Sequence, residues 1–535
     1  MKPLFLFCTL LFNLTSTAQW STDPALPLVV CDAPNEQRLM RAIADADSGY
    51  YVFWSDLRND PNKAELYGQH FDSEGNALWA QNGELLLSNP IKSINQVAPL
   101  LMPGGSVIVA YMTGSTNNGA DTVRAMRFDA NANALWAEPS VLLTGLDYRS
   151  MKVVASDSCA YVVAYCESCG GGGYGCKMQR VRMDGTVLFP LPGQTTASNY
   201  FGPYTIHPDG AGGVLFSIRC SNGAGTCLKS QRFDSLGTAA WPAYIDLADG
   251  TGLQYAFATT MDGAGALTAV WEVAADDLRM HRVDTLGNSL WLPAVQMACD
   301  LAVYVQQDPV AVTNANELFV AWDDNRPPAA NSDLYIQKYD LNTGAELWAA
   351  DGVPAIQTNT YIPTTGLVLS DSGGVIVTFD GNLDGYSAMR IRNDGTQAWP
   401  APVVFCVPSF NPFYERRVHL PDGNGGVVAF WEGSFGELYG ARVYRNGKLY
   451  DDVGIGEVKN TTVINAYPNP AQDRVTFKLP DGERLIQVEL ADVLGSISPV
   501  AADGSSIATD HLSNGTYVAR LRTANAIFTA RFIKH

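Results

Sequence analysis

Two short segments of the sequence combine an aromatic ring, a carboxylate and a guanidinium group in the order W-x-D-x-R. A partial copy of the pattern has Trp followed by Glu. The residues of the three places are Trp54, Asp56 and Arg58, then Trp322, Asp324 and Arg326, and finally Trp431 and Glu432. Such a set can bind a ligand by ring stacking and charged hydrogen bonds. The structural alternative is that each Asp–Arg pair fixes the loop of its own segment.

The chain offers little material for the common hydrolytic mechanisms. It has only six histidines, and the motifs H-E-x-x-H, G-x-S-x-G and the phosphate-binding glycine loops are missing. The D-G-x-G turns lack the alternating oxygen ligands that calcium needs. We therefore predict no metal, no cofactor and no catalytic residues, and we leave the question of enzymatic activity open.

The charge of the chain also excludes one class of partner. The formal net charge is −19, and Lys and Arg form no cluster along the sequence. A phosphate backbone would be repelled, so we do not expect nucleic acid to bind.

The elements that position these residues repeat along the chain. The phrase FDSEGNALW at 71–79 returns as FDSLGTAAW at 233–241 and VDTLGNSLW at 283–291. Its final aromatic recurs every 50 to 57 residues, at Trp79, Trp136, Phe189, Trp241, Trp291, Trp348 and Trp399, with Tyr450 as a degenerate eighth copy. An alternating apolar segment precedes each copy. Repeats of this length with short strands and Gly/Asp turns predict an all-β fold, an eight-bladed β-propeller over residues 19–458.

Two resemblances to propeller enzymes suggest alternatives to a binding role. The D-x-x-G-x-x-x-W turn resembles the Asp-box of sialidases, which implies three arginines around a substrate carboxylate; Arg38, Arg149 and Arg416 begin predicted inner strands. The segment YDLNTGAELW at 339–348 resembles the docking phrase of pyrroloquinoline quinone dehydrogenases. A glycoside hydrolase is thus the first alternative, and a quinone-dependent oxidoreductase is the second.

The beginning of the chain predicts export and closure of the ring. Residues 1–18 join Lys2 to an apolar run and a small-residue end, as a secretory signal peptide does. The apolar run from Trp20 to Val30 looks like the outer half of a repeat, and we expect it to complete the last blade. No later apolar run is long enough to cross a membrane.

Export to an oxidising compartment favours disulfides over thiol–metal sites. Cys220 and Cys227 bracket one Gly-rich loop, and Cys169 and Cys176 bracket another. We predict one disulfide across each loop.

The last residues, about 459–535, differ in character from the repeats. They contain Tyr467-Pro468-Asn469-Pro470, then a turn ending at Gly495, a second turn with Gly515 and Tyr517, and a basic end at Lys534. This ordered set resembles the C-terminal sorting domain of the type IX secretion system of Bacteroidota. The resemblance implies a small β-sandwich that the secretion machinery recognises at the outer membrane.

Together, these patterns predict a β-propeller protein that is secreted or held at the cell surface. We expect it to bind a glycan or a surface protein, besides its transient partner, the secretion machinery.

Overall fold

The computed structural model describes most of the chain. The described residues are 19–88, 92–114, 120–167, 174–198, 202–221, 226–248, 254–273, 277–299, 301, 305–327, 333–357, 363–380, 385–407, 417–451, 462–480, 483–491, 497–523 and 527–535. The chain divides into two compact units, Met1–Tyr450 and Asp451–His535. The predicted signal peptide and the predicted boundary at 458/459 lie outside the described residues.

The larger unit consists of antiparallel sheets, because its apolar residues alternate along short strands and give each strand buried faces. Within the described ranges it contains six four-stranded sheets and one seven-stranded sheet. Five of the four-stranded sheets are each formed by four consecutive strands of the chain. The first sheet contains β2(Gln37–Ala44), β3(Tyr50–Asp56), β4(Glu65–Phe71) and β5(Glu84–Leu87), and the second contains β13(Tyr204–Pro208), β14(Val214–Ser221), β15(Thr226–Phe233) and β16(Ile245–Asp246). The remaining three contain β17(Gln254–Met261), β18(Leu267–Val273), β19(Asp277–Val283) and β20(Val295–Cys299); β21(Gln306–Thr313), β22(Glu317–Asp324), β23(Asp333–Asp340) and β24(Val353–Ile356); and β25(Thr364–Leu369), β26(Val375–Asp380), β27(Tyr386–Ile391) and β28(Val403–Cys406), with the 3₁₀ turn η1(Asp371–Gly373) between β25 and β26.

The seven-stranded sheet joins two repeats through one long strand. Its members are β6(Ser93–Leu101), β7(Val107–Gly114), β8(Ala120–Phe128), β9(Ser140–Ser156), β10(Cys159–Cys166), β11(Gly175–Arg182) and β12(Gln194–Ser198). The first half of β9 pairs with β8 and the second half with β10. The strand therefore serves as the outer strand of one repeat and the inner strand of the next. The eight-blade count, which treats this sheet as two blades, stays a prediction.

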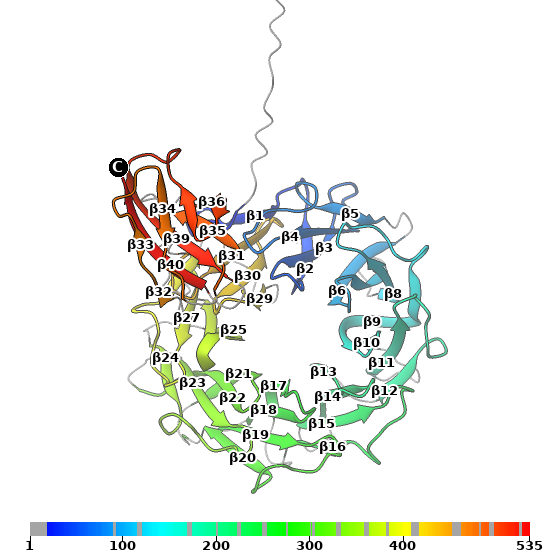
Figure 1. The fold of residues 1–535 in the computed structure, drawn as a ribbon. Coiled ribbons are helices and arrows are strands. Elements are labelled where there is room, and N and C mark those ends of the chain that lie inside the picture. Colours follow the sequence, from blue (N-terminus) through cyan, green and yellow to red (C-terminus); the bar gives the residue numbers. More distant parts are fainter. Residues whose placement is uncertain are drawn as a thin grey trace, which may run out of the picture. The chain divides into compact units, whose positions relative to one another are not determined.

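The sheets of the larger unit are arranged as a ring (Figure 1). The first strand of each repeat is the innermost one: β2, β6, the second half of β9, β13, β17, β21, β25 and β29. Along most of the ring each of these strands contacts the first strand of the next repeat, and β29 contacts β2 to close the circle. This is the architecture of a β-propeller, as the repeats predict.

The N-terminal strand completes the last sheet, which confirms the predicted closure. That sheet has the order β1(Leu28–Cys31), β31(Leu438–Val443), β30(Val427–Glu432) and β29(Arg417–Pro421). Strand β1 pairs antiparallel with β31, with Leu28 opposite Gly440. Pairing the first strand of the unit with its last repeat removes the free edge that an open ring would expose.

The repeated phrase of the sequence is a turn that joins neighbouring sheets. Oδ1 of Asp72 accepts the N–H groups of Glu74 and Asn76 at 2.9 and 2.8 Å. Gly75 has φ = +81°, and a Cβ atom there would lie 2.9 Å from the backbone N of Trp20. The indole Nε1 of Trp79 donates to the carbonyl of Ala130 in the next repeat at 2.8 Å. The Trp thus packs between neighbouring repeats, as predicted.

Trp20, rather than Tyr450, makes this contact for the last repeat. Its indole Nε1 donates to the carbonyl of Ser73 at 2.9 Å, and its ring is 4% exposed. The side chain of Tyr450 is 48% exposed. The aromatic of the last repeat is therefore provided by the N-terminal segment together with β1.

The smaller unit is a β-sandwich of two sheets. Its strands are β32(Thr462–Val463), β33(Ala466–Tyr467), β34(Arg474–Phe477), β35(Gln487–Ala491), β36(Ile497–Val500), β37(Ala502–Asp503), β38(Ser506–Ala508), β39(Gly515–Arg522) and β40(Ile527–Lys534). One sheet has the order β32-β40-β39-β35-β36 and the other β33-β34-β38-β37. Phe477, Leu490, Ile507, Leu521 and Phe532 are among the buried residues of the core between them.

Candidate ligand-binding site

The first W-x-D-x-R segment forms a closed set of hydrogen bonds at the end of β3. Nε1 of Trp54 and Nη2 of Arg58 both donate to Oδ2 of Asp56, at 2.7 and 2.6 Å. The backbone N–H of Arg58 donates to the other carboxylate oxygen at 2.8 Å. The guanidinium also lies 3.9 Å from the ring centre of Tyr67. The Asp56 side chain is 0% exposed, so its charge is satisfied inside the ring.

The second segment repeats this geometry at the end of β22. Trp322 Nε1 and Arg326 Nη2 donate to Oδ2 of Asp324 at 2.9 and 2.5 Å, and the Arg326 N–H donates to Oδ1 at 2.9 Å. The guanidinium stacks on Tyr335 at 3.9 Å. The Asp324 side chain is likewise 0% exposed.

The partial copy at the end of β30 joins the last repeat to the first. Glu432 accepts the backbone N–H of Met40 in β2 at 2.7 Å, and Trp431 is completely buried. In all three places the charged side chains form hydrogen bonds within the protein, as expected if they stabilise the fold rather than bind a ligand. Ligand binding by these eight residues stays a prediction.

A buried cysteine beside each guanidinium was not anticipated from the sequence. Nη2 of Arg58 lies 3.1 Å from Sγ of Cys31, and Nη2 of Arg326 lies 3.4 Å from Sγ of Cys299. Burial raises the pKa of Cys31 to about 11 and that of Cys299 to about 12, although the guanidinium opposes the shift. Both thiols stay protonated near neutral pH and act as packing groups. The sequence feature that could have indicated this contact is that each cysteine is the last residue of an apolar outer strand.

The two predicted disulfides differ in outcome. Cys220 and Cys227 form a disulfide, which confirms the first prediction. Cys176 carries a free thiol, so the predicted disulfide between Cys169 and Cys176 is wrong. Cys166 is disulfide-bonded instead. Cys169 lies outside the described residues. The reason is register: Cys176 belongs to β11, opposite Tyr165, and is completely buried in the core, away from the loop.

The arginines suggested by the sialidase resemblance do not form a common site among the described residues. Arg149 pairs with Asp147 at 2.8 Å and with Glu167 at 2.9 Å. Arg38 lies 3.8 Å from Glu36. Arg416 lies outside the described residues. Each described guanidinium is thus engaged by carboxylates near its own strand. In addition, no group of three or more His, Cys, Asp and Glu residues in the described ranges is placed to hold a metal ion.

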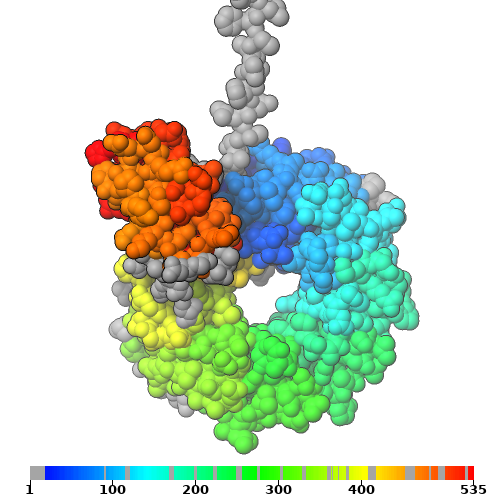
Figure 2. All heavy atoms as spheres, in the orientation of Figure 1, coloured from blue at the N-terminus to red at the C-terminus, as the bar shows by residue number. Residues whose placement is uncertain are grey.

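The inner wall of the ring brings together polar groups that the sequence did not single out. Figure 2 shows an opening at the centre of the ring, and the first strands of the repeats surround it. Nε2 of His207 in β13 lies 2.8 Å from Oγ1 of Thr259 in β17, and this hydroxyl donates to Thr205 at 2.7 Å. The hydroxyls of Thr260 and Thr313 lie 3.0 Å apart, between β17 and β21. Imidazole and hydroxyl side chains therefore form a belt of two hydrogen-bonded groups over three repeats.

Two cations extend this belt. Lys152 lies in β9, and its Nζ is 5.7 Å from the ring centre of Tyr204 in β13. Burial lowers the pKa of Lys152, and the charge of Arg41 in β2 lowers it further. Burial and the charge of Lys152 in turn lower the pKa of His207 to about 4. Lys152 thus lies on one inner strand, with its ammonium group near a ring of the next inner strand.

The predicted sorting residues hold the end of the smaller unit together. Oδ1 of Asn469 accepts the N–H of Ile533 at 2.8 Å, which fixes the Tyr467-Pro468-Asn469-Pro470 segment against β40. Tyr517 stacks on Phe532, with ring centres 5.6 Å apart. Gly515 opens β39 and Lys534 ends β40, where the two residues pair. Gly495 lies outside the described residues.

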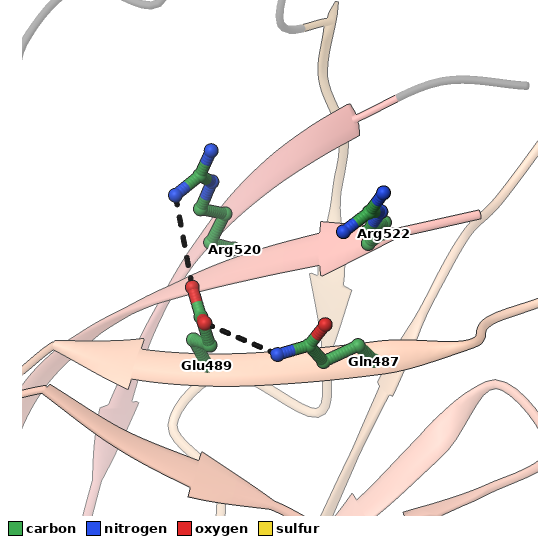
Figure 3. A pocket seen from close by; sticks show the side chains of 4 residues that line it. All are labelled: Gln487, Glu489, Arg520 and Arg522. Atoms are coloured by element: carbon green, nitrogen blue, oxygen red, sulfur yellow. Dashed lines mark hydrogen bonds and ion pairs between the residues drawn. The ribbon is translucent and has the colours of Figure 1, made fainter. Parts of the chain in front are cut away.

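A polar patch lies on the exposed face of the smaller unit, across β35 and β39 (Figure 3). Glu489 accepts a hydrogen bond from Gln487 at 3.2 Å and lies 3.7 Å from Arg520. Arg522 completes the rim of a shallow recess of about 150 Å³. The ion pair is half-exposed and contributes little to stability.

Comparisons with known proteins identify the smaller unit. Residues 465–535 match the family described as the secretion system C-terminal sorting domain. These residues are the sorting domain of the type IX secretion system, and they imply export to the cell surface or secretion. In the described part of the chain, no helix is long and apolar enough to cross a membrane.

Solved structures similar to this chain share little sequence with it. A protein of unknown function from Dyadobacter fermentans is 11% identical, with a TM-score of 0.30 over 58% of this chain and 95% of its own. The β-propeller domain of the Trilobed protease from Pyrococcus furiosus is 10% identical, with a TM-score of 0.35 over 71% and 95%. An ulvan lyase is 11% identical, with a TM-score of 0.39 over 81% and 96%. A search of the curated proteins finds no match.

Proposed function

We propose that this protein is a binding protein that is exported by the type IX secretion system and recognises a glycan at the inner wall of its propeller. The observation that carries the proposal is the belt of His207, Thr205, Thr259, Thr260 and Thr313 around the opening. Hydroxyl and imidazole groups both donate and accept hydrogen bonds, and sugar hydroxyls need such partners.

The candidate arginines lie beside carboxylates of their own repeats, which supports a binding role over glycoside hydrolysis. Arg149 is held by two carboxylates, and Arg38 lies beside a third. A sialidase-like site would need such guanidinium groups to converge on a substrate carboxylate. Within the described residues, the inner wall instead offers groups suited to hydrogen bonding with a neutral or charged sugar.

A glycan array tests this function. The mature chain, residues 19–535, is expected to be retained by a defined set of glycans, and Thr259→Val is expected to weaken that retention because the belt loses a hydroxyl. Thr396→Val is the matched control, since Thr396 lies in an exposed turn and bonds only locally, to Asp394 and Arg392. An empty array, or equal retention of both variants, would contradict the proposal.

A further inference from the structure

The two inner-wall cations occupy equivalent positions two repeats apart. Arg41 pairs with Phe53, and Lys152 pairs with Val163. Phe53 and Val163 hold the same place in the second strand of their repeats. Each follows by six residues the Asp of a D-S pair in the preceding turn, Asp47 and Asp157 respectively. Arg41 and Lys152 therefore hold the same register position in the first strands of their repeats.

The other residues at this register position are small or uncharged. They are Ala98, Thr205, Ala258, Val310, Gly366 and Val418, as their partners in the second strands show. Ala98 holds this position in the first strand between them, where it is buried. No carboxylate stands at this position in the eight first strands.

Lys152 has no anionic partner among the described residues. Its ammonium group lies near the ring of Tyr204, and the positive charge of Arg41 acts on it by repulsion. Asp147 in β9 and Glu167, directly after β10, both pair with Arg149. The chain as a whole carries a net charge of −19. A positive site on the wall of such a protein would attract an anion that the outer surface repels.

We propose that Lys152 binds a carboxylate or sulfate group of an acidic glycan at the inner wall of the ring. The neighbouring His207 and Thr259 then accept and donate hydrogen bonds to adjacent hydroxyl groups of the same sugar chain. This inference rests on the proposed function and adds the chemical class of the ligand. Charge-assisted hydrogen bonds supply the selectivity for anionic sugars over neutral ones.

The test uses labelled oligogalacturonate as the carboxylate probe, sulfated dextran oligomers as the sulfate probe and neutral dextran oligomers as the reference. At low salt, at least one anionic probe is expected to bind the mature chain more tightly than neutral dextran. Lys152→Gln is expected to weaken this binding about 10- to 100-fold, because a hydrogen bond to a charged group contributes about 1.5–3 kcal/mol. Lys152→Arg should retain most of it.

Lys177→Gln is the matched control, because Lys177 lies in the same repeat and is bonded to the hydroxyl of Thr195. Its melting temperature and that of Lys152→Gln should stay near the original value. Equal binding of neutral dextran, or anionic binding that Lys152→Gln leaves unchanged, would overturn the inference.

The glycan array separates this inference from the proposed function. If the array retains only neutral glycans, the acidic ligand is refuted while glycan binding stands. If the array retains no glycan, the proposed function itself fails. Any glycan that the array retains is then measured with the same three variants.

Discussion

Replacing Asp56 with Ala removes the acceptor at the centre of the first W-x-D-x-R cluster. The change leaves the indole N–H of Trp54 and the guanidinium of Arg58 without their shared partner, in a place where the carboxylate is 0% exposed. Breaking a buried ion pair by removing one partner costs about 3–5 kcal/mol. This exceeds the roughly 1 kcal/mol expected for an ordinary hydrogen-bonded pair, because burial prevents water from replacing the lost contacts.

The expected change in melting temperature follows from the size of the ring. With an unfolding entropy of about 2.1 cal/mol/K per residue, a cooperative unit of roughly 430 residues has an unfolding entropy of about 0.9 kcal/mol/K. A loss of about 3–5 kcal/mol then lowers the melting temperature by about 3–6 °C. Asp324→Ala should produce a similar fall, because the second cluster has the same geometry.

Differential scanning calorimetry of the mature chain measures this effect. The control is Asp121→Ala, which removes the half-exposed ion pair with Lys92 and should cost at most about 1 kcal/mol. If Asp56→Ala melts no lower than Asp121→Ala, the buried cluster does not stabilise the ring and the reasoning is refuted. A loss of glycan binding with unchanged stability would instead favour the ligand-binding interpretation of Asp56.

Four other results are expected. Trp20→Ala should destabilise the ring by about 3–5 kcal/mol in urea unfolding, as for other buried Trp residues, whereas Tyr450→Ala should have little effect; equal effects would refute closure by Trp20. Deleting residues 459–535 should leave the protein in the periplasm, and cell fractionation showing normal export would contradict this. Cys176 should resist thiol-reactive dyes until the protein unfolds, and labelling of the native chain, located by mass spectrometry, would count against its burial. Burial lowers the pKa of His419 from 6.5 to about 4. As the pH falls, the unfolded chain therefore binds a proton at this histidine before the folded chain does, and the free energy of unfolding should decrease between about pH 6.5 and pH 4. If His419→Gln shows the same dependence of unfolding free energy on pH, this reasoning is wrong.

The architecture could be predicted from the sequence because its causes are local. Alternating apolar residues define a strand, and the D-x-x-G turn with its positive φ at Gly75 ends one strand and begins the next. Repetition of this local unit predicts a ring of sheets. Because the first and the last repeat are each incomplete, the sequence also predicts that a strand from one pairs with strands of the other. Strand β1 indeed pairs with β31. The sorting segment was likewise evident from an ordered set of short motifs.

The sequence pattern could not determine which charged groups are available to a ligand. Asp56 and Lys152 are both charged residues on predicted strands, and spacing alone suggested only the first as a site residue. Folding buries Asp56 against Trp54 and Arg58, because all three lie at the end of one strand.

By itself, then, the sequence determined the repeat, the closure of the ring and the address at its C-terminus, since each is signalled by a short pattern of residues that are close along the chain. Only the tertiary structure decided the candidate site. Arg41 and Lys152 are more than one hundred residues apart, and the charge of Arg41 acts on Lys152 because the ring brings their inner strands together. The same applies to Trp20, whose partner Ser73 belongs to the next repeat around the closed circle.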